Sequence, residues 1–85
     1  MDFSHIENIR SAAEKGDLDS QFRLAKIYAS FNELFMAAVW FERAAKGGHA
    51  DAQLETAKLY ERGAGVEKNA DKAAYWFKMS ESSDL

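Results

Sequence analysis

The fold of this chain is decided by three short stretches: Ala57-Lys58-Leu59-Tyr60, Gly63-Ala64-Gly65-Val66 and Lys72-Ala73-Ala74-Tyr75-Trp76-Phe77. They predict a helix, a turn and a second helix, because glycine readily takes the left-handed backbone that tight turns need. A partial copy precedes them, with Ala25-Lys26-Ile27-Tyr28, a shorter connection and then Ala37-Ala38-Val39-Trp40-Phe41. The pattern therefore predicts a repeated helical hairpin with an aromatic anchor on each helix.

The two copies align at a fixed register. The offset from Ala25 to Ala57 superimposes their first helices, and the longer offset from Trp40 to Trp76 superimposes their second helices. The second copy thus has four extra residues in its turn. Self-similarity at a period of this size is the signature of helical repeat proteins. The coinciding pairs are Ala25 and Ala57, Lys26 and Lys58, Tyr28 and Tyr60, and Trp40-Phe41 and Trp76-Phe77.

Five helices are expected, and the prediction is an all-α fold without strands. Gly16 suits the left-handed residue that ends a helix, and Asp17 and Asn32 are candidate N-caps for the helices that follow them. The expected helices cover about residues 3–14, 18–29, 33–46, 50–62 and from Asn69 or Asp71 to about Met79. Residues 1–16 would form a capping helix, 17–48 and 49–80 the two repeats, and 81–85 a frayed tail.

Buried stripes follow from helical periodicity. The expected inward residues are Phe3, Ile6, Ile9 and Ala13 on the first helix, Ser20, Leu24, Ile27 and Tyr28 on the second, and Ala52, Thr56, Leu59 and Tyr60 on the fourth. The two tryptophans are expected in the core, because each buried aromatic removes about 150–250 Å² from water.

Composition bounds the function. The 85 residues suit one small domain, and a formal charge of −3 argues against a nucleic-acid binder, which needs a basic face. The start of the chain shows no signal peptide, and the longest apolar run, Phe35 to Phe41, is too short to cross a membrane. A cytoplasmic protein without membrane contact is therefore expected.

No catalytic, metal or cofactor site is predicted. His5 and His49 are far apart in sequence, and the chain has no cysteine to complete a zinc site with them. The stretch Gly63-Ala64-Gly65-Val66 lacks the Gly-Lys-Ser/Thr of a phosphate loop, and a turn explains both of its glycines. His49 is expected only to satisfy the entry of the following helix.

The second copy resembles the Sel-one-like repeat family, a branch of the tetratricopeptide-type repeats. The resemblance rests on Ala52-Gln53, Ala57, Tyr60, Gly63, Gly65-Val66, Lys72-Ala73 and Trp76-Phe77, and it covers about residues 8–79. It implies an α-α superhelix of about two hairpins plus an N-terminal capping helix. It also implies a non-catalytic adaptor that binds a protein or peptide partner. The first copy departs from the family by lacking the Gly-x-Gly-Val turn.

By analogy with tetratricopeptide grooves, the first helix of each hairpin would line a concave binding surface. The alternative is an ordinary solvated face with local ion pairs between Asp19 and Arg23 and between Glu55 and Lys58. Exposed Phe22 and Leu54 favour binding, because apolar side chains inside a charged rim suit an interface. The candidate groove residues are Asp19, Phe22, Arg23, Lys26, Asp51, Leu54, Glu55, Lys58 and Arg62.

The short turn of the first copy concentrates large apolar residues, namely Phe31, Leu34, Phe35 and Met36. They either pack beneath the connection or form an exposed patch, and such patches usually mark contact surfaces. The second interpretation predicts a self-associating structural or regulatory subunit that forms a homodimer through this edge.

Overall fold

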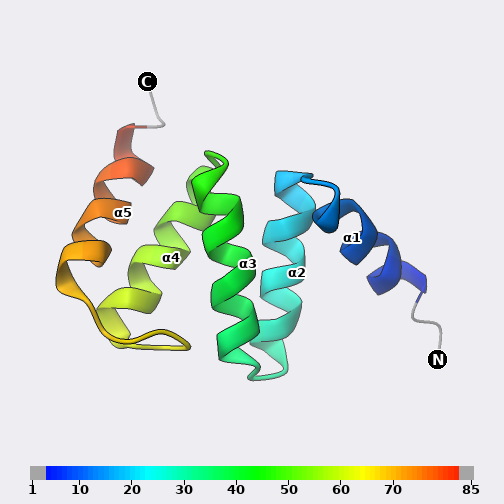
Figure 1. Ribbon diagram of the computed structural model, residues 1–85, viewed down its shortest axis with the longest axis horizontal. Helices are drawn as coiled ribbons and strands as arrows, with labels where there is room; N and C mark the ends of the chain where they lie inside the picture. Colours follow the sequence, from blue (N-terminus) through cyan, green and yellow to red (C-terminus); the bar gives the residue numbers. More distant parts are fainter. Residues whose placement is uncertain (1–3, 83–85) are drawn as a thin grey trace.

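The computed structural model describes residues 4–82, and these form five helices (Figure 1). The helices are α1 (Ser4–Glu14), α2 (Leu18–Ser30), α3 (Leu34–Lys46), α4 (Ala50–Arg62) and α5 (Ala70–Ser82). The predicted all-α helical repeat is confirmed. The connection between α2 and α3 spans residues 31–33 and that between α4 and α5 spans 63–69, which accounts for the four extra residues of the second copy.

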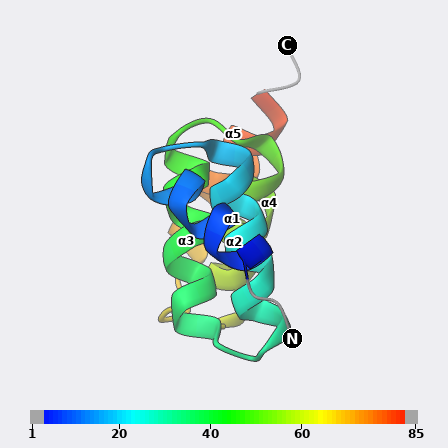
Figure 2. The same ribbon diagram turned by 90° about the vertical axis from the view of Figure 1, so that its right-hand side faces the viewer.

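The helices follow one another along an elongated body with extents of 41 × 29 × 15 Å. Extensive contacts join only helices that are adjacent in the sequence, as in a solenoid. Helices α1 and α5 lie at opposite ends of the row, and the view along the row shows α3 on one side and α4 on the other (Figures 1 and 2). Neighbouring helices therefore alternate between two layers.

The core consists of two clusters, one around each tryptophan. Trp40 packs with the apolar residues between α1, α2 and α3, and Trp76 packs with those between α3, α4 and α5. Both indole rings are buried, with 7% and 6% of their surface exposed, as predicted. Phe22 is half-buried and packs against both clusters, so it links the two halves of the core.

Three of the predicted helix boundaries are confirmed. Gly16 has a φ of +102°, and Asp17 caps α2 by accepting hydrogen bonds from the backbone N–H of Ser20, at 3.0 Å, and from the Ser20 hydroxyl. These two bonds, the hydroxyl bond first, hold the pKa of Asp17 below its ordinary value. Gly63 ends α4 in the left-handed conformation, with a φ of +71°.

The predicted capping role of Asn32 is wrong. Helix α3 begins at Leu34, its N-cap residue Glu33 makes no side-chain capping bond, and Asn32 instead takes a left-handed φ of +60°. The backbone N–H of Asn32 donates to the carbonyl of Ala29 at 2.9 Å, so this residue closes α2. Asparagine tolerates the left-handed region better than most residues, and the three-residue connection requires a residue there.

Helix α5 continues to Ser82, three residues beyond its expected end. The hydroxyls of Ser80 and Ser82 donate to the carbonyls of Phe77 and Met79 at 2.7 and 3.0 Å, and the second bond supplies a partner for one of the last four carbonyls of the helix. The caps predicted for α5 were Asn69 or Asp71, and Asn69 is the one that accepts the backbone N–H of Lys72, at 3.0 Å. The expected burial of Phe3 and fraying of 83–85 fall outside the described residues.

The buried stripe of α2 differs from the prediction. Only Leu24 of the four expected residues is buried, whereas Ser20, Ile27 and Tyr28 are half-buried. Gln21 and Ala25 are buried instead. On α4, three of the four expected residues are buried and Leu59 is half-buried, while Gln53 is again buried in the position equivalent to Gln21.

Candidate binding groove between helices α2 and α4

A hollow of about 430 Å³ lies between α2 and α4, with one residue of α3 in its lining. Because α2 and α4 are the first helices of the two hairpins, this is the place where the sequence predicted a groove. Three of the nine candidate residues line it: Phe22, Lys26 and Glu55. The remaining lining comes from Ala29, Ser30, Phe41 and Leu59.

Phe22 forms a fixed aromatic wall of this groove. Its ring stacks on His49 with centroids 4.6 Å apart and meets the edge of Phe41 at 5.6 Å. The ammonium of Lys26 lies 5.4 Å from the ring centroid of Phe22, within the range of a cation–π contact. Phe22 was expected to be exposed, but these three contacts leave it half-buried. The hollow therefore has an apolar surface that contacts within the chain hold in place.

Charges of opposite sign stand on the two sides of the groove. Lys26 is on α2 and Glu55 is on α4, and both line the hollow. Glu55 pairs with Lys58 at 3.7 Å, which confirms the predicted local pair. Exposed pairs of this kind contribute only about 0–1 kcal/mol, so a ligand can replace them at little cost.

The other candidate groove residues lie outside the hollow. Asp19 pairs with His49 at 3.1 Å, and the expected pair between Asp19 and Arg23 is not among the ion pairs of residues 4–82. Asp19 pairs with the histidine because that ring is held beside it, whereas Arg23 lies one turn along the same exposed face. Five of these candidates are exposed, namely Asp19, Arg23, Asp51, Leu54 and Arg62, and the sixth, Lys58, is half-buried.

His49 fixes the end of the groove. Its Nδ1 accepts the backbone N–H of Ala52 at 3.1 Å and so caps α4, as the sequence predicted for this helix entry. Nε2 therefore carries the proton that is donated to Asp19. One side chain thus joins the start of α4 to α2 and supports the Phe22 ring from one face.

Sequence analysis missed part of the lining for an identifiable reason. Phe41 and Leu59 stand at helical positions that fit a core stripe equally well, and Ala29 is too small to distinguish a groove from a helix contact. The available signal was the spacing of positions 22, 26 and 29, which lie on one face of α2. That spacing places Ala29 and Lys26 beside Phe22.

The apolar edge at the short turn is largely exposed. Phe31 and Phe35 expose 71% and 69% of their surface, and Leu34 exposes 36%. Met36 is half-buried and packs against the cluster around Trp40. Packing beneath the connection therefore describes Met36 only, and the two phenylalanine rings face solvent in the described chain.

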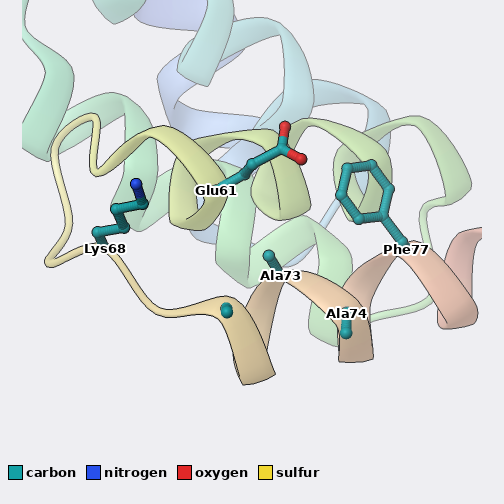
Figure 3. Close-up of a pocket in the computed structure, with 6 residues that line it drawn as sticks. Glu61, Lys68, Ala73, Ala74 and Phe77 are labelled. Carbon is teal, nitrogen blue, oxygen red and sulfur yellow. The ribbon is translucent and has the colours of Figure 1, made fainter.

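A second hollow, of about 320 Å³, lies between α4 and α5 (Figure 3). Ala73, Ala74 and Phe77 approach it from α5, and Glu61 approaches it from α4. Lys68 lies in the connection between the two helices and lines the hollow at the end away from Phe77. Sequence analysis did not single out this place.

Within residues 4–82, no three His, Cys, Asp or Glu side chains are grouped so as to hold a metal ion. Burial and the hydrogen bond from Tyr60 to Glu42, at 2.7 Å, raise the pKa of Tyr60 to about 12. A phenol with this pKa stays protonated at neutral pH, so Tyr60 serves as a structural hydrogen-bond donor. Within the described helices none is long and apolar enough to span a membrane.

The alternating layers, the equivalent hairpins and the sequential helix contacts define a helical repeat protein. The Sel1 repeat model matches residues 18–34, 33–49 and 50–84, and the chain belongs to the Sel1 repeat family. The second hairpin is matched as one unit, whereas the first is matched as two pieces that meet at its short turn. The first hairpin thus departs from the family at the turn that the sequence comparison identified.

Among solved structures, the crystal structure of a Sel1 repeat protein from Oxalobacter formigenes superimposes with a TM-score of 0.81 at 34% sequence identity. The alignment covers 87% of this chain and 60% of the other, so this chain spans about three fifths of that protein. A search of curated proteins finds no match. Repeats of this family are generally protein-interaction modules.

Proposed function

We propose that this protein is a non-catalytic interaction module that binds a peptide or protein segment in the groove between α2 and α4. The observation that carries the proposal is the hollow of about 430 Å³ at that place. Its size falls within the range of about 300–1,000 Å³ that is usual for ligand sites. Its mixed apolar and charged lining suits a polypeptide better than a small anion or a metal ion.

The lining indicates what the partner must offer. Phe22, Phe41 and Leu59 provide an apolar surface for one large side chain of the partner, which would act as its anchor. Lys26 favours a partner carboxylate beside that anchor, and Glu55 favours a partner cation on the other side. A short amphipathic segment with one apolar anchor and flanking charges of both signs meets these requirements.

Charge reversal tests the groove. Peptides are first selected against the wild-type protein from a displayed random library, and their dissociation constants are measured by titration. Lys26→Glu combined with Lys58→Glu is expected to weaken the selected peptides by about tenfold or more, because Lys26→Glu replaces the cation that faces the partner carboxylate and a hydrogen bond to a charged group is worth about 1.5–3 kcal/mol. Lys15→Glu is the matched control, since Lys15 is exposed in the α1–α2 connection away from the groove. Unchanged affinity in the double variant would show that the partner binds elsewhere.

The proposed module works in the cytoplasm and binds neither nucleic acid nor membranes. The formal charge of −3 supports this view, because a nucleic-acid surface requires a basic patch. Localisation of the tagged protein by fractionation, together with a duplex-DNA and RNA binding assay, checks both parts. Retention on nucleic acid at physiological salt would contradict the second part.

A second candidate function is self-assembly through the edge formed by Phe31, Leu34, Phe35 and Met36. Phe31 and Phe35, which are 71% and 69% exposed, favour it, since exposed aromatics of this size usually mark a contact surface. The double variant Phe31→Ser with Phe35→Ser changes only exposed side chains and is expected to abolish association while leaving the fold intact. Sedimentation that shows a strict monomer of the wild-type protein at high concentration would exclude this candidate.

A further inference from the structure

Helix α5 carries the packing surface of a repeat helix, but the described residues do not cover it. The offset that relates Trp40 to Trp76 also pairs Ala38 with Ala74 and Phe41 with Phe77. Ala38 and Phe41 are each 4% exposed, because α4 packs over α3. Their equivalents on α5 are more open: Ala74 is exposed and Phe77 is half-buried. The small and large residues that make a close helix contact in the first hairpin are thus repeated without a neighbour in the second.

The spacing along this open face is that of a helix pair. Ala70, Ala74, Phe77 and Glu81 follow one another at intervals of four, three and four residues, the heptad spacing that keeps one stripe of a helix toward a partner helix. Two further residues, Asp71 and Lys78, flank the stripe on one side. They stand seven residues apart and so occupy the same heptad position with opposite charges.

These flanking charges are available for an external contact. Asp71 and Lys78 are both exposed, and neither belongs to the ion pairs found in residues 4–82. In an antiparallel pair of identical helices, residues of this flanking position meet across the interface. Asp71 of one helix would then face Lys78 of the other, and the same contact would occur twice.

We propose that the occupant of this face is a second copy of the chain, with the two α5 helices packed antiparallel about a two-fold axis near the middle of the helix. Such an interface is isologous, so one self-complementary surface suffices. At its centre each Ala74 lies opposite the partner's Phe77, and this pairing of small with large lets the helices approach closely. The hollow of about 320 Å³ beside Ala74 leaves room for that ring (Figure 3).

The charges select the antiparallel second copy over the other arrangements. In a parallel pair, residues of this flanking position lie on opposite sides of the interface, so Asp71 and Lys78 of the two helices would not meet and the two ion pairs would not form. A foreign helix would need its own complementary charges, whereas the chain already carries both. One helix from each partner makes a small interface, so the dimer is weak and forms only at micromolar to millimolar concentrations.

A charge swap tests the pairing. Sedimentation equilibrium at low salt, from about 10 µM to about 1 mM protein, is expected to show a monomer–dimer equilibrium. Asp71→Lys and Lys78→Asp are each expected to raise the dissociation constant about fivefold or more, and the double variant Asp71→Lys with Lys78→Asp is expected to restore it. Lys15→Asp, an exposed charge reversal far from α5, should leave it unchanged. Circular dichroism of every variant checks the fold.

A cross-link locates the interface independently of the charges. The chain contains no cysteine, so Ala74→Cys introduces a single thiol on the proposed face, within about one turn of the two-fold axis. A short bifunctional maleimide, which spans the gap between the two thiols, is expected to give covalent dimers of this variant much faster than of the control Ser11→Cys, which places a thiol on the exposed side of α1.

Three results would overturn the proposal. The first is a monomer throughout the concentration range. The second is a dimer that the double charge swap does not rescue, or that only the Phe31 and Phe35 substitutions abolish. The third is equal cross-linking of the two cysteine variants. Peptide binding in the groove between α2 and α4 is measured separately, so it can fail or succeed without deciding this question.

Discussion

Two buried glutamines join successive hairpins by the same contact. The Nε2 of Gln21 donates to the carbonyl of Ala13 at 3.1 Å, and the Nε2 of Gln53 donates to the carbonyl of Ala45 at 3.2 Å. The offset that relates the two donors is the same as the one that relates the two acceptors. Glutamine is usually exposed, and its burial here is possible because each amide reaches a backbone carbonyl near the end of the preceding helix. The register was visible in the sequence, but this partner depends on the packing of two helices.

A second pair of equivalent contacts joins the same positions in both copies, but the hydrogen bond runs in the opposite direction and the charged partner has the opposite sign. The hydroxyl of Tyr28 accepts a hydrogen bond from Arg10 at 2.9 Å, whereas the hydroxyl of Tyr60 donates one to Glu42 at 2.7 Å. Arg10 and Glu42 are separated by the same offset as the two tyrosines. Helix α1 therefore stands toward α2 as α3 stands toward α4, which supports the view of α1 as a shortened second helix of a hairpin.

Tyr60 gives a titration prediction. Burial, and then its bond to Glu42, raise its pKa from 10.0 to about 12, so the folded protein holds this proton more tightly than the unfolded chain. The resulting stability is fully present below about pH 10 and is lost as the pH rises through about 12, a loss of about 2–3 kcal/mol. Absorbance of tyrosinate should show one of the three tyrosines ionising late, and Tyr60→Phe should remove that late step. A late step that persists in Tyr60→Phe would assign the shifted pKa to another tyrosine.

At the scale of elements, the two hairpins differ in the turn between their helices. The longer turn, between α4 and α5, contacts the start of α3 in the first hairpin. A Cβ added to Gly65 would lie 2.2 Å from the carbonyl oxygen of Leu34, so the α4–α5 connection packs directly against the start of α3. The glycines of this turn therefore do more than end a helix. Sequence analysis explained them by backbone conformation alone, because a contact between two segments far apart in the chain leaves no periodic signal.

Gly65→Ala is therefore expected to destabilise the protein by more than Gly63→Ala. Both residues have a positive φ, +75° and +71°, so both alanines carry a conformational cost of about 1–3 kcal/mol. At Gly63 the nearest atom to the new Cβ is the Cβ of Lys68 at 3.2 Å, a tight contact that a small shift relieves, whereas the 2.2 Å approach to the Leu34 carbonyl oxygen at Gly65 requires the backbone to move much further. Denaturant unfolding of the two variants measures the difference. Equal losses would mean that the connection yields and that the contact with Leu34 is not tight.

Over the whole molecule, sequence predicted the features that repeat and missed those that do not. The hairpins and the buried tryptophans follow from a local spacing that occurs twice. The helix ends at Gly16, Asp17 and Gly63 follow from the intrinsic preference of a single residue. Three features depend instead on the three-residue connection and on helix packing. They are the left-handed conformation of Asn32, the burial of Gln21 and Ala25 in place of the expected residues of α2, and the pairing of Asp19 with His49. For the groove, helical spacing identified Phe22, Lys26 and Glu55, but which neighbours close it depends on the angle between α2, α3 and α4.

The two halves of the core are coupled, and this coupling decides how the protein unfolds. In long repeat arrays each hairpin contacts only its neighbours, and one end can unfold alone. Here Phe22 packs against both tryptophan clusters, and His49 joins the start of α4 to α2. Each cluster alone is small for a chain of 85 residues, which buries only about two thirds of its unfolded surface. The two clusters should therefore unfold together.

Trp76→Ala tests this cooperativity. Removing the buried ring should cost about 3–5 kcal/mol, a large part of the roughly 5–15 kcal/mol available to a small domain. If the clusters are coupled, the variant loses amide protection against hydrogen exchange in α2 as well as in α5, although Trp76 packs in the second cluster only. Trp40→Ala is the matched variant in the first cluster, and it should expose α4 amides in the same way. Retained protection in α2 of Trp76→Ala would show that Phe22 and His49 do not bind the hairpins into one unit, and that the first hairpin folds on its own.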